Sequence, residues 1–189
     1  MRLQESHPPE TRHAGLLLAA LPSLQDSNFR RTIILITHHD QAGAMGFILN
    51  RPTHQLLEDL LEAPKEVLGV PVFEGGPVEQ QHLILTRLLW KDAGVRFQSL
   101  SEKDLAVQSE ESIHVEGNLI AFTGYAGWTA GQLEQEIGEK SWHVLKPSAE
   151  MLQPVRTKEE GIHRWKAIMK NLGSVFHLLA QAPDNPSLN

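Results

Sequence analysis

The chain has 189 residues, 41% of them hydrophobic, which is enough for one domain with a buried core and excludes a disordered or fibrous protein. A formal net charge of −6 disfavours general binding to nucleic-acid phosphates, and the absence of cysteine excludes disulfides, thiol nucleophiles and cysteine-ligated zinc or iron–sulfur sites. The apolar run from Gly15 stops at Pro22, too short for a membrane span, so we expect a cytoplasmic protein with no membrane contact.

The first part of the chain predicts a tail followed by a hairpin. Residues 1–13 are polar, without a hydrophobic period, and we expect them to form a flexible tail. The β-branched and apolar run Thr32–Thr37 predicts a buried strand, and a second strand is expected at Met45–Leu49. The connecting turn, His38–Ala42, is short enough to make the pair a hairpin, which we place in the middle of a sheet.

The middle of the chain predicts a helix and several further strands. Leu56, Leu57, Leu60 and Leu61 have the spacing of one helix face, and Pro64 would end that helix. A second, short helix is expected at Glu102–Ser109. Short apolar runs bring the expected sheet to six or seven strands, the additional ones at Val70–Phe73, Leu83–Leu88, Val95–Phe97, Ile113–Val115 and Leu119–Phe122.

The C-terminal part predicts a long amphipathic helix. Apolar residues between Ile162 and Leu172 form one stripe of a helix over Glu159–Leu172, which would end at Gly173. A shorter helix is expected at Val175–Ala180, and residues 183–189 form a polar tail. No repeat or linker interrupts residues 14–182, so we expect a single mixed α/β domain.

The clearest local signal is the segment from Gly124 to Gly138. Thr129 as the N-cap and Gln132 at N3 would form a capping box, with Trp128 and Leu133 as a hydrophobic staple. The glycines permit a tight strand-to-helix turn, and the free amides at a helix start favour an anion. Either Trp128 and the glycines only build this turn, or they belong to a binding surface.

Two other segments are open to more than one interpretation. Gly75 and Gly76 allow a close backbone approach, either to a neighbouring strand or to a ligand. His38–Asp40 is a dense group of potential metal ligands, but because only two of the three can share a face we expect a solvated turn, no metal and no cofactor.

Asn50 and Arg51 stand at the end of a buried strand. Pro52 restricts Arg51 to an extended conformation and so directs its side chain off the strand end, as an anion site requires. The alternative is a structural ion pair between Arg51 and an acidic residue such as Glu58 or Glu74.

Three blocks of the sequence resemble the bacterial AlgH/YqgE family in order and spacing: Leu16–Pro52, Phe73–Val78 (FEGGPV) and Gly124–Ile137 (GYAGWTAGQLEQEI). Trp142 and the helix from Trp165 to Gly173 also fit the family. The resemblance implies a single domain whose mixed, strongly bent β-sheet is packed by helices. It implies no catalytic residue, since the family, although often labelled a transcriptional regulator, has no assigned biochemical activity.

Our leading hypothesis is a non-enzymatic binding or regulatory protein that contacts a protein or a small molecule at the glycine turns. One alternative is an enzyme that holds an anionic substrate with Asn50, Arg51 and the amides of 129–131. The other is direct DNA binding, which the acidic charge opposes and which has only Arg30–Arg31 as an adjacent basic pair. The candidate ligand-binding residues are Asn50, Arg51, Gly75, Gly76, Tyr125, Gly127, Trp128, Thr129 and Gly131.

Overall fold

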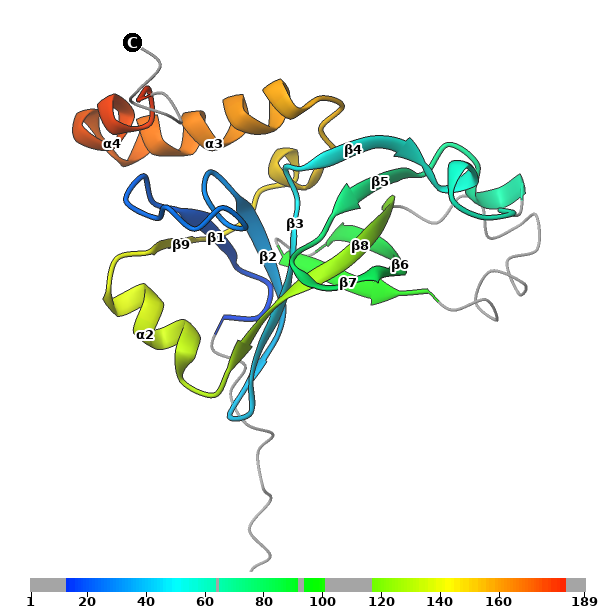
Figure 1. Cartoon of the computed structure of the whole chain (residues 1–189), viewed down its shortest axis with the longest axis horizontal. Coiled ribbons are helices and arrows are strands. Elements are labelled where there is room, and N and C mark those ends of the chain that lie inside the picture. Colours follow the sequence, from blue (N-terminus) through cyan, green and yellow to red (C-terminus); the bar gives the residue numbers. More distant parts are fainter. Residues whose placement is uncertain (1–12, 64, 92–93, 101–116, 183–189) are drawn as a thin grey trace, which may run out of the picture.

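The structure is a computed structural model that describes residues 13–63, 65–91, 94–100 and 117–182 (Figure 1). The expected helix at Glu102–Ser109 and the expected strand at Ile113–Val115 lie outside these residues. The described elements in chain order are β1 (Leu17–Ala20), β2 (Ile33–Asp40), β3 (Gly43–Ile48), β4 (Pro52–Leu56), η1 (Leu57–Asp59), η2 (Lys65–Val67), β5 (Pro71–Glu74), β6 (Val78–Lys91), β7 (Gly94–Ser99), β8 (Asn118–Thr129), α2 (Gln132–Gly138), β9 (Trp142–Leu145), η4 (Glu150–Leu152), α3 (Lys158–Leu172) and α4 (Ser174–Leu179).

The strands form one mixed sheet that bends along β8. Its main path runs β4-β5-β8-β3-β2-β1-β9, and β6 pairs with both β7 and β8. The first half of β8 lies parallel to β5 and antiparallel to β6, whereas its second half pairs with β3. Gly124 stands between the two halves at φ 66°, where a Cβ atom would lie 2.6 Å from the carbonyl oxygen of Val78. The expected mixed, bent sheet packed by helices is confirmed.

The layer formed by β1, β2 and β3 is buried on both faces. Leu17, Ile33 and Leu35 pack in the cluster that contains Trp165 of α3, while the alternate residues Leu18 and Ile34 pack on the opposite face. That opposite face is covered by α2, which contributes Leu133, and Figure 1 shows α3 and α4 on the other side of these strands. Burial on both faces explains why the sequence of β2 is apolar without alternation. The predicted hairpin at the centre of the sheet is confirmed.

The helix predicted from the leucines at 56–61 is wrong. β4 continues to Leu56, a single 3-10 turn follows, and of these four leucines only Leu57 is buried, in a third cluster with Val67 and Val72. The start of this segment is held in the sheet instead, where Leu56 pairs with Pro71 and the N–H of Leu57 donates to the carbonyl of Val70.

The C-terminal helices agree with the sequence prediction within one residue at their starts. The side chain of Thr157 accepts the N–H of Glu160 and caps α3, and Gly173 separates α3 from α4. Trp165 anchors α3 to the sheet, where its indole N–H donates to the carbonyl of Ala20 at 2.7 Å. None of the described helices has both the length and the apolar composition that crossing a membrane requires.

Candidate functional site

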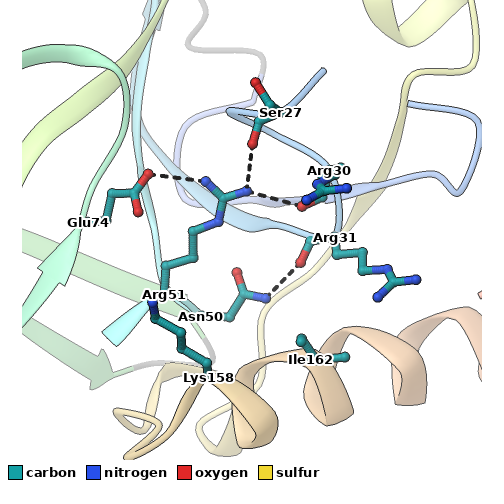
Figure 2. Close-up of a pocket in the computed structure, with 8 residues that line it drawn as sticks. All are labelled: Ser27, Arg30, Arg31, Asn50, Arg51, Glu74, Lys158 and Ile162. Atoms are coloured by element: carbon teal, nitrogen blue, oxygen red, sulfur yellow. Dashed lines mark hydrogen bonds and ion pairs between the residues drawn. The ribbon is translucent and has the colours of Figure 1, made fainter. Parts of the chain in front are cut away.

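A pocket of about 310 Å³ lies where four parts of the fold meet (Figure 2). They are the β1–β2 loop, the β3–β4 junction, the end of β5 and the first turns of α3. Four of its lining side chains are cationic and one is a carboxylate, in a chain whose net charge is −6. The lining residues are Ser27, Arg30, Arg31, Asn50, Arg51, Glu74, Lys158 and Ile162.

Arg51 projects into this pocket and is held on three sides. One terminal nitrogen donates to Glu74 at 3.2 Å, and the other donates to the carbonyl oxygens of Ser27 and Arg30 (Figure 2). Glu74 is one of the two acidic residues that the sequence suggested as an ion-pair partner for Arg51. Because three of the guanidinium's hydrogen bonds go to the protein, Arg51 shapes the pocket wall and contributes charge to it.

Asn50 joins three segments beneath the pocket. Its side-chain oxygen accepts the N–H of Ile33 at 2.8 Å, and its amide group donates to the carbonyls of Arg31 and Gly161. Both amide hydrogens are therefore used within the protein, and the side chain is buried. Gly161 can lie this close to Asn50 because it has no side chain. A Cβ at Gly161 would overlap the backbone of Asn50. Asn50 fixes α3 against the β2–β3 hairpin.

The β1–β2 loop carries two arginines, Arg30 and Arg31, and the second has a strained backbone conformation. Arg31 adopts φ 57°, an uncommon conformation for a residue with a side chain. Its guanidinium donates to the carbonyl of Ala182 and lies over the ring of Trp165, 5.8 Å from the centroid. Upstream, Asp26 accepts the N–H of Asn28 and shapes the loop. The chain thus holds an unfavourable backbone conformation at the pocket wall, which is a recurrent feature of functional sites.

Lys158 enters the pocket from the first turn of α3. Its side chain is exposed, and no hydrogen bond of its ammonium to another described residue is present, although its charge contributes to the lowered pKa of the adjacent Glu159. The next residue, Glu159, has its pKa lowered by its own backbone N–H and by the Thr157 hydroxyl, so its carboxylate compensates the helix start. Lys158 is the pocket cation whose ammonium is not committed within the described part of the fold.

Gly75 and Gly76 allow two backbone segments of the sheet to pack closely together. The N–H of Gly75 donates to the carbonyl of Thr123, and its carbonyl accepts the N–H of Ile48. A Cβ on Gly75 would overlap the carbonyl of Gly124, and one on Gly76 would overlap the backbone of Tyr125. Of the two interpretations, the close approach is therefore to a neighbouring strand. The partly buried Tyr125 packs against the main core cluster.

The predicted capping box at Thr129 is wrong in register. β8 continues through Thr129 because it pairs with Gly43, and α2 begins at Gln132 with Gly131 as its N-cap at φ 75°. Gln132 still accepts the N–H of Thr129 at 3.0 Å, so one half of the predicted exchange exists. Because Gln132 occupies that amide, and because α2 begins after it, the expected row of free amides at 129–131 is not formed as predicted.

Trp128 is buried in the second core cluster together with Leu133, the partner that the staple predicted. Its indole N–H donates to Glu136, which also accepts the indole N–H of Trp142. Phe29 stacks on Trp128 and meets the edge of Trp142. Gly127 is exposed, and a Cβ there would face Tyr125 and Val78 instead of this aromatic cluster. The described residues that line the pocket include none from 124–131, so the structure does not bring Arg51 and the start of α2 into one cavity.

The solvated turn expected at His38–Asp40 is wrong, because all three residues belong to β2 and pair with β3. His38 is exposed and contacts Asp40 at 3.0 Å, whereas His39 is buried and contacts Glu134 of α2. His39 is withdrawn from solvent because α2 packs over it. Among the described residues, no group of three or more His, Asp or Glu side chains is arranged to hold a metal ion.

Sequence reasoning identified Asn50 and Arg51 but not the remaining pocket residues. The sequence singles out Arg30 and Arg31 only as a basic pair for DNA contact, and Glu74 only as an ion-pair partner for Arg51. For Lys158 the available signal was a lysine in the first helical turn, where the helix dipole disfavours a cation.

Comparison with known proteins gives the family. The sequence profile described as AlgH-like matches residues 17–177. The chain belongs to the AlgH-like family. Among its AlgH-like relatives, a UPF0301 protein of Streptomyces avermitilis is 34% identical, with 93% of this chain and 94% of that protein covered. A UPF0301 protein of Shewanella woodyi is also 34% identical, over 83% of this chain and 89% of the relative.

Two solved structures share the AlgH-like fold. A crystal structure of a Corynebacterium diphtheriae protein matches with a TM-score of 0.67 at 21% identity and covers 95% of both chains. The solution structure of the AlgH protein from Pseudomonas aeruginosa matches with a TM-score of 0.60 at 24% identity, covering 96% of this chain and 98% of that one.

Proposed function

We propose that this AlgH-like protein is a non-enzymatic binding protein for a small anionic ligand, which it holds in the pocket beside Lys158 and Arg51. The observation that carries this proposal is the charge of the pocket lining. It contains three arginines and a lysine but only one carboxylate, although the whole chain is acidic. A cavity of about 310 Å³ is at the lower end of the size range of small-molecule sites.

The environment of Lys158 supports an anion rather than a neutral ligand. Arg51 is already paired with Glu74, so the pocket's carboxylate is neutralised within the wall. Lys158 stands in the first turn of a 15-residue helix, whose N-terminus adds partial positive charge. Ile162, one turn further along α3, offers the ligand an apolar contact. A carboxylate or phosphate with a small apolar part fits this lining.

The chemistry of the lining favours binding over turnover. Its carboxylate, Glu74, is engaged by Arg51, and the Asn50 amide is fully used within the protein. Neither group is placed as a general base with a nucleophile in reach, which is the arrangement that acyl or phosphoryl transfer requires. We therefore propose that the pocket binds its ligand without converting it.

The test is calorimetric titration and thermal unfolding of the purified protein with phosphate, pyrophosphate and citrate. At an anion concentration about 100 times the Kd, binding should stabilise the fold by about 2.7 kcal/mol and raise Tm by roughly 5–11 °C. The Lys158→Met variant should weaken binding about tenfold or more, since it removes a charge-assisted contact.

Lys170→Met is the matched control, because Lys170 is an exposed lysine near the other end of the same helix. It should bind the anion like the wild-type protein. Absence of a Tm shift with all three anions, or equal effects of the two lysine substitutions, would contradict an anion site at this pocket.

A further inference from the structure

A second pocket, of about 510 Å³, lies between β4 and the segment that leads into α3. Figure 1 shows this segment passing beside β4, and we call the cavity the β4 pocket. Its volume is within the usual range of small-molecule sites. None of its described lining residues belongs to the pocket of Arg51 and Lys158, so the two cavities are separate candidates for ligand binding.

One wall of the β4 pocket is a bulge in β4. Between its two pairs with β5, β4 advances four residues while β5 advances two. The hydroxyl of Thr53 donates to the carbonyl of Val72 at 2.9 Å and accepts the backbone N–H of Gln55 at 3.2 Å. His54, between Thr53 and Gln55, adopts φ 67°. The bulge is thus fixed by hydrogen bonds, and it places His54 and Gln55 in the pocket lining.

The opposite wall, residues 153–156, is held by two side chains of α3. The guanidinium of Arg164 donates to the carbonyl of Gln153 at 2.6 Å, and the carboxylate of Glu160 accepts the backbone N–H of Arg156 at 2.6 Å. Val155 is buried in the main core cluster, whereas the side chain of Arg156 is exposed. The backbone of both walls is therefore fixed before any ligand arrives.

Most of the lining between these walls is apolar. Its buried members come from both sides of the pocket, and Leu56 at 39% exposure is the apolar side chain most open to water. A ligand with an apolar body would cover these side chains and remove Leu56 from solvent, which favours binding. The apolar lining residues are Pro52, Leu56, Pro71, Val72, Pro154 and Val155.

Arg156 supplies a cation at this apolar lining. Among the described residues, its hydrogen bond is made by the backbone N–H, which leaves the guanidinium for a ligand. The described lining contains no Asp or Glu. Of the carboxylates beside it, Glu58 and Glu160 each accept a backbone N–H of the lining. Glu159 is engaged by its own backbone N–H, and the charge of His54 also contributes to its lowered pKa.

We propose that the β4 pocket binds a monocarboxylic acid with an apolar aliphatic or aromatic body, whose carboxylate is bound by the guanidinium of Arg156. The planar guanidinium can donate to both oxygens of a carboxylate at once. One arginine beside apolar walls favours a single negative charge, in contrast to the several cations of the pocket around Lys158. The two proposals rest on different residues, so either can fail without the other.

The experiment is a titration of the ¹⁵N-labelled full chain with octanoate and with 4-phenylbutanoate, followed by the backbone amide signals in NMR. The amides of Gln55, Gly69 and Val155 should shift with either acid, whereas those of Ser27 and Ile162 in the other pocket should not. 1-Octanol has the same chain length without the charge. It should bind about tenfold more weakly than octanoate or worse, since it lacks the charge-assisted hydrogen bonds to Arg156.

Arg156→Met removes the guanidinium and should weaken octanoate binding about tenfold or more. Lys158→Met, two residues further along, is the matched control and should bind octanoate like the wild-type protein. Both side chains are exposed, so the urea midpoint of each variant should stay close to that of the wild type. Octanol binding as tight as octanoate binding, equal effects of the two substitutions, or no shift of the β4-pocket amides with either acid would overturn the proposal.

Discussion

At the scale of single residues, Arg51 connects three segments of chain through its contacts with Glu74, Ser27 and Arg30. Replacing Arg51 with methionine keeps much of the side-chain volume but leaves these acceptors without their donor. We expect Arg51→Met to destabilise the fold by about 1–3 kcal/mol, the range for losing a charge-assisted hydrogen-bond donor. Urea unfolding measures this loss, and Lys158→Met, at an exposed side chain, should leave the midpoint nearly unchanged.

Trp128 is buried between Phe29 and Trp142 and donates its indole N–H to Glu136. Trp128→Ala should destabilise by about 3–5 kcal/mol because it removes a large buried side chain and leaves a cavity. Trp90→Ala is the matched control, since Trp90 is partly exposed on β6 and should cost less. Urea denaturation compares the two. Equal losses would mean that the aromatic cluster does not contribute more than an ordinary surface tryptophan.

Glu134 gives the fold a pH dependence with a definite sign. Its pKa is lowered from 4.5 by its own backbone N–H, and also by the charges of His39 and His13, against the opposing effect of desolvation. Because this pKa is lowered on folding, the ionised Glu134 carboxylate stabilises the fold at pH values above about 4.5. This stabilisation is lost as the pH falls through the pKa of Glu134 in the folded state. Glu134→Gln should therefore be less stable than the wild type near pH 7, with the difference shrinking well below pH 4.5. Urea titrations at both pH values measure it.

At the scale of secondary-structure elements, the segment between β4 and β5 separates one buried leucine from several exposed ones. Leu57 is 3% exposed and packs with Val67 and Val72, whereas Leu60 is 42% exposed. Leu57→Ala should cost about 2–5 kcal/mol, while Leu60→Ala should stay within about 0.5 kcal/mol. Urea unfolding of the two variants distinguishes this turn from the amphipathic helix that the leucine spacing predicts, since such a helix would bury both side chains.

How far sequence could predict an element depended on whether local signals or long-range pairing decide it. The helix over 158–172 was predictable because its apolar stripe, its acidic first turn and Gly173 all lie within the element itself. β9 was missed because a four-residue strand with no alternation exists only through its pairing with β1. The start of α2 was misplaced because strand pairing between Thr129 and Gly43 outweighs the local capping preference.

The pocket was only half predictable for the same reason. Arg51 stood out because Pro52 constrains it and a buried strand leads into it. Lys158 lies 107 residues later in the chain, and it reaches the pocket only because Gly161 allows α3 to approach the backbone of Asn50. That contact depends on the packing of a helix across the sheet, which leaves no periodicity or motif in the sequence.

At the scale of the whole molecule, the length of the central β2–β3 hairpin separates the proposed anion pocket from α2. The half of β8 that pairs with β3 leads to α2, which contacts His39 through Glu134, while the proposed anion pocket lies beside the opposite end of β3, at Asn50 and Arg51. The central hairpin therefore has the proposed ligand site at one end and the contact between His39 and Glu134 at the other. Both ends share the rigid, doubly buried strands β2 and β3.

The distribution of charge over the molecule also decides what the protein should not bind. The basic side chains of the pocket form one concave group in a chain of net charge −6, whereas duplex DNA requires many phosphate contacts along a surface. We expect binding to random duplex DNA to be weaker than about 10⁻⁶ M at ~150 mM salt, measured by fluorescence anisotropy. Pyrophosphate should compete for whatever weak binding remains, because both anions would meet the same pocket. Tighter binding that Lys158→Met leaves intact would place a nucleic-acid surface elsewhere on the molecule and would favour the regulator hypothesis over a small-ligand site.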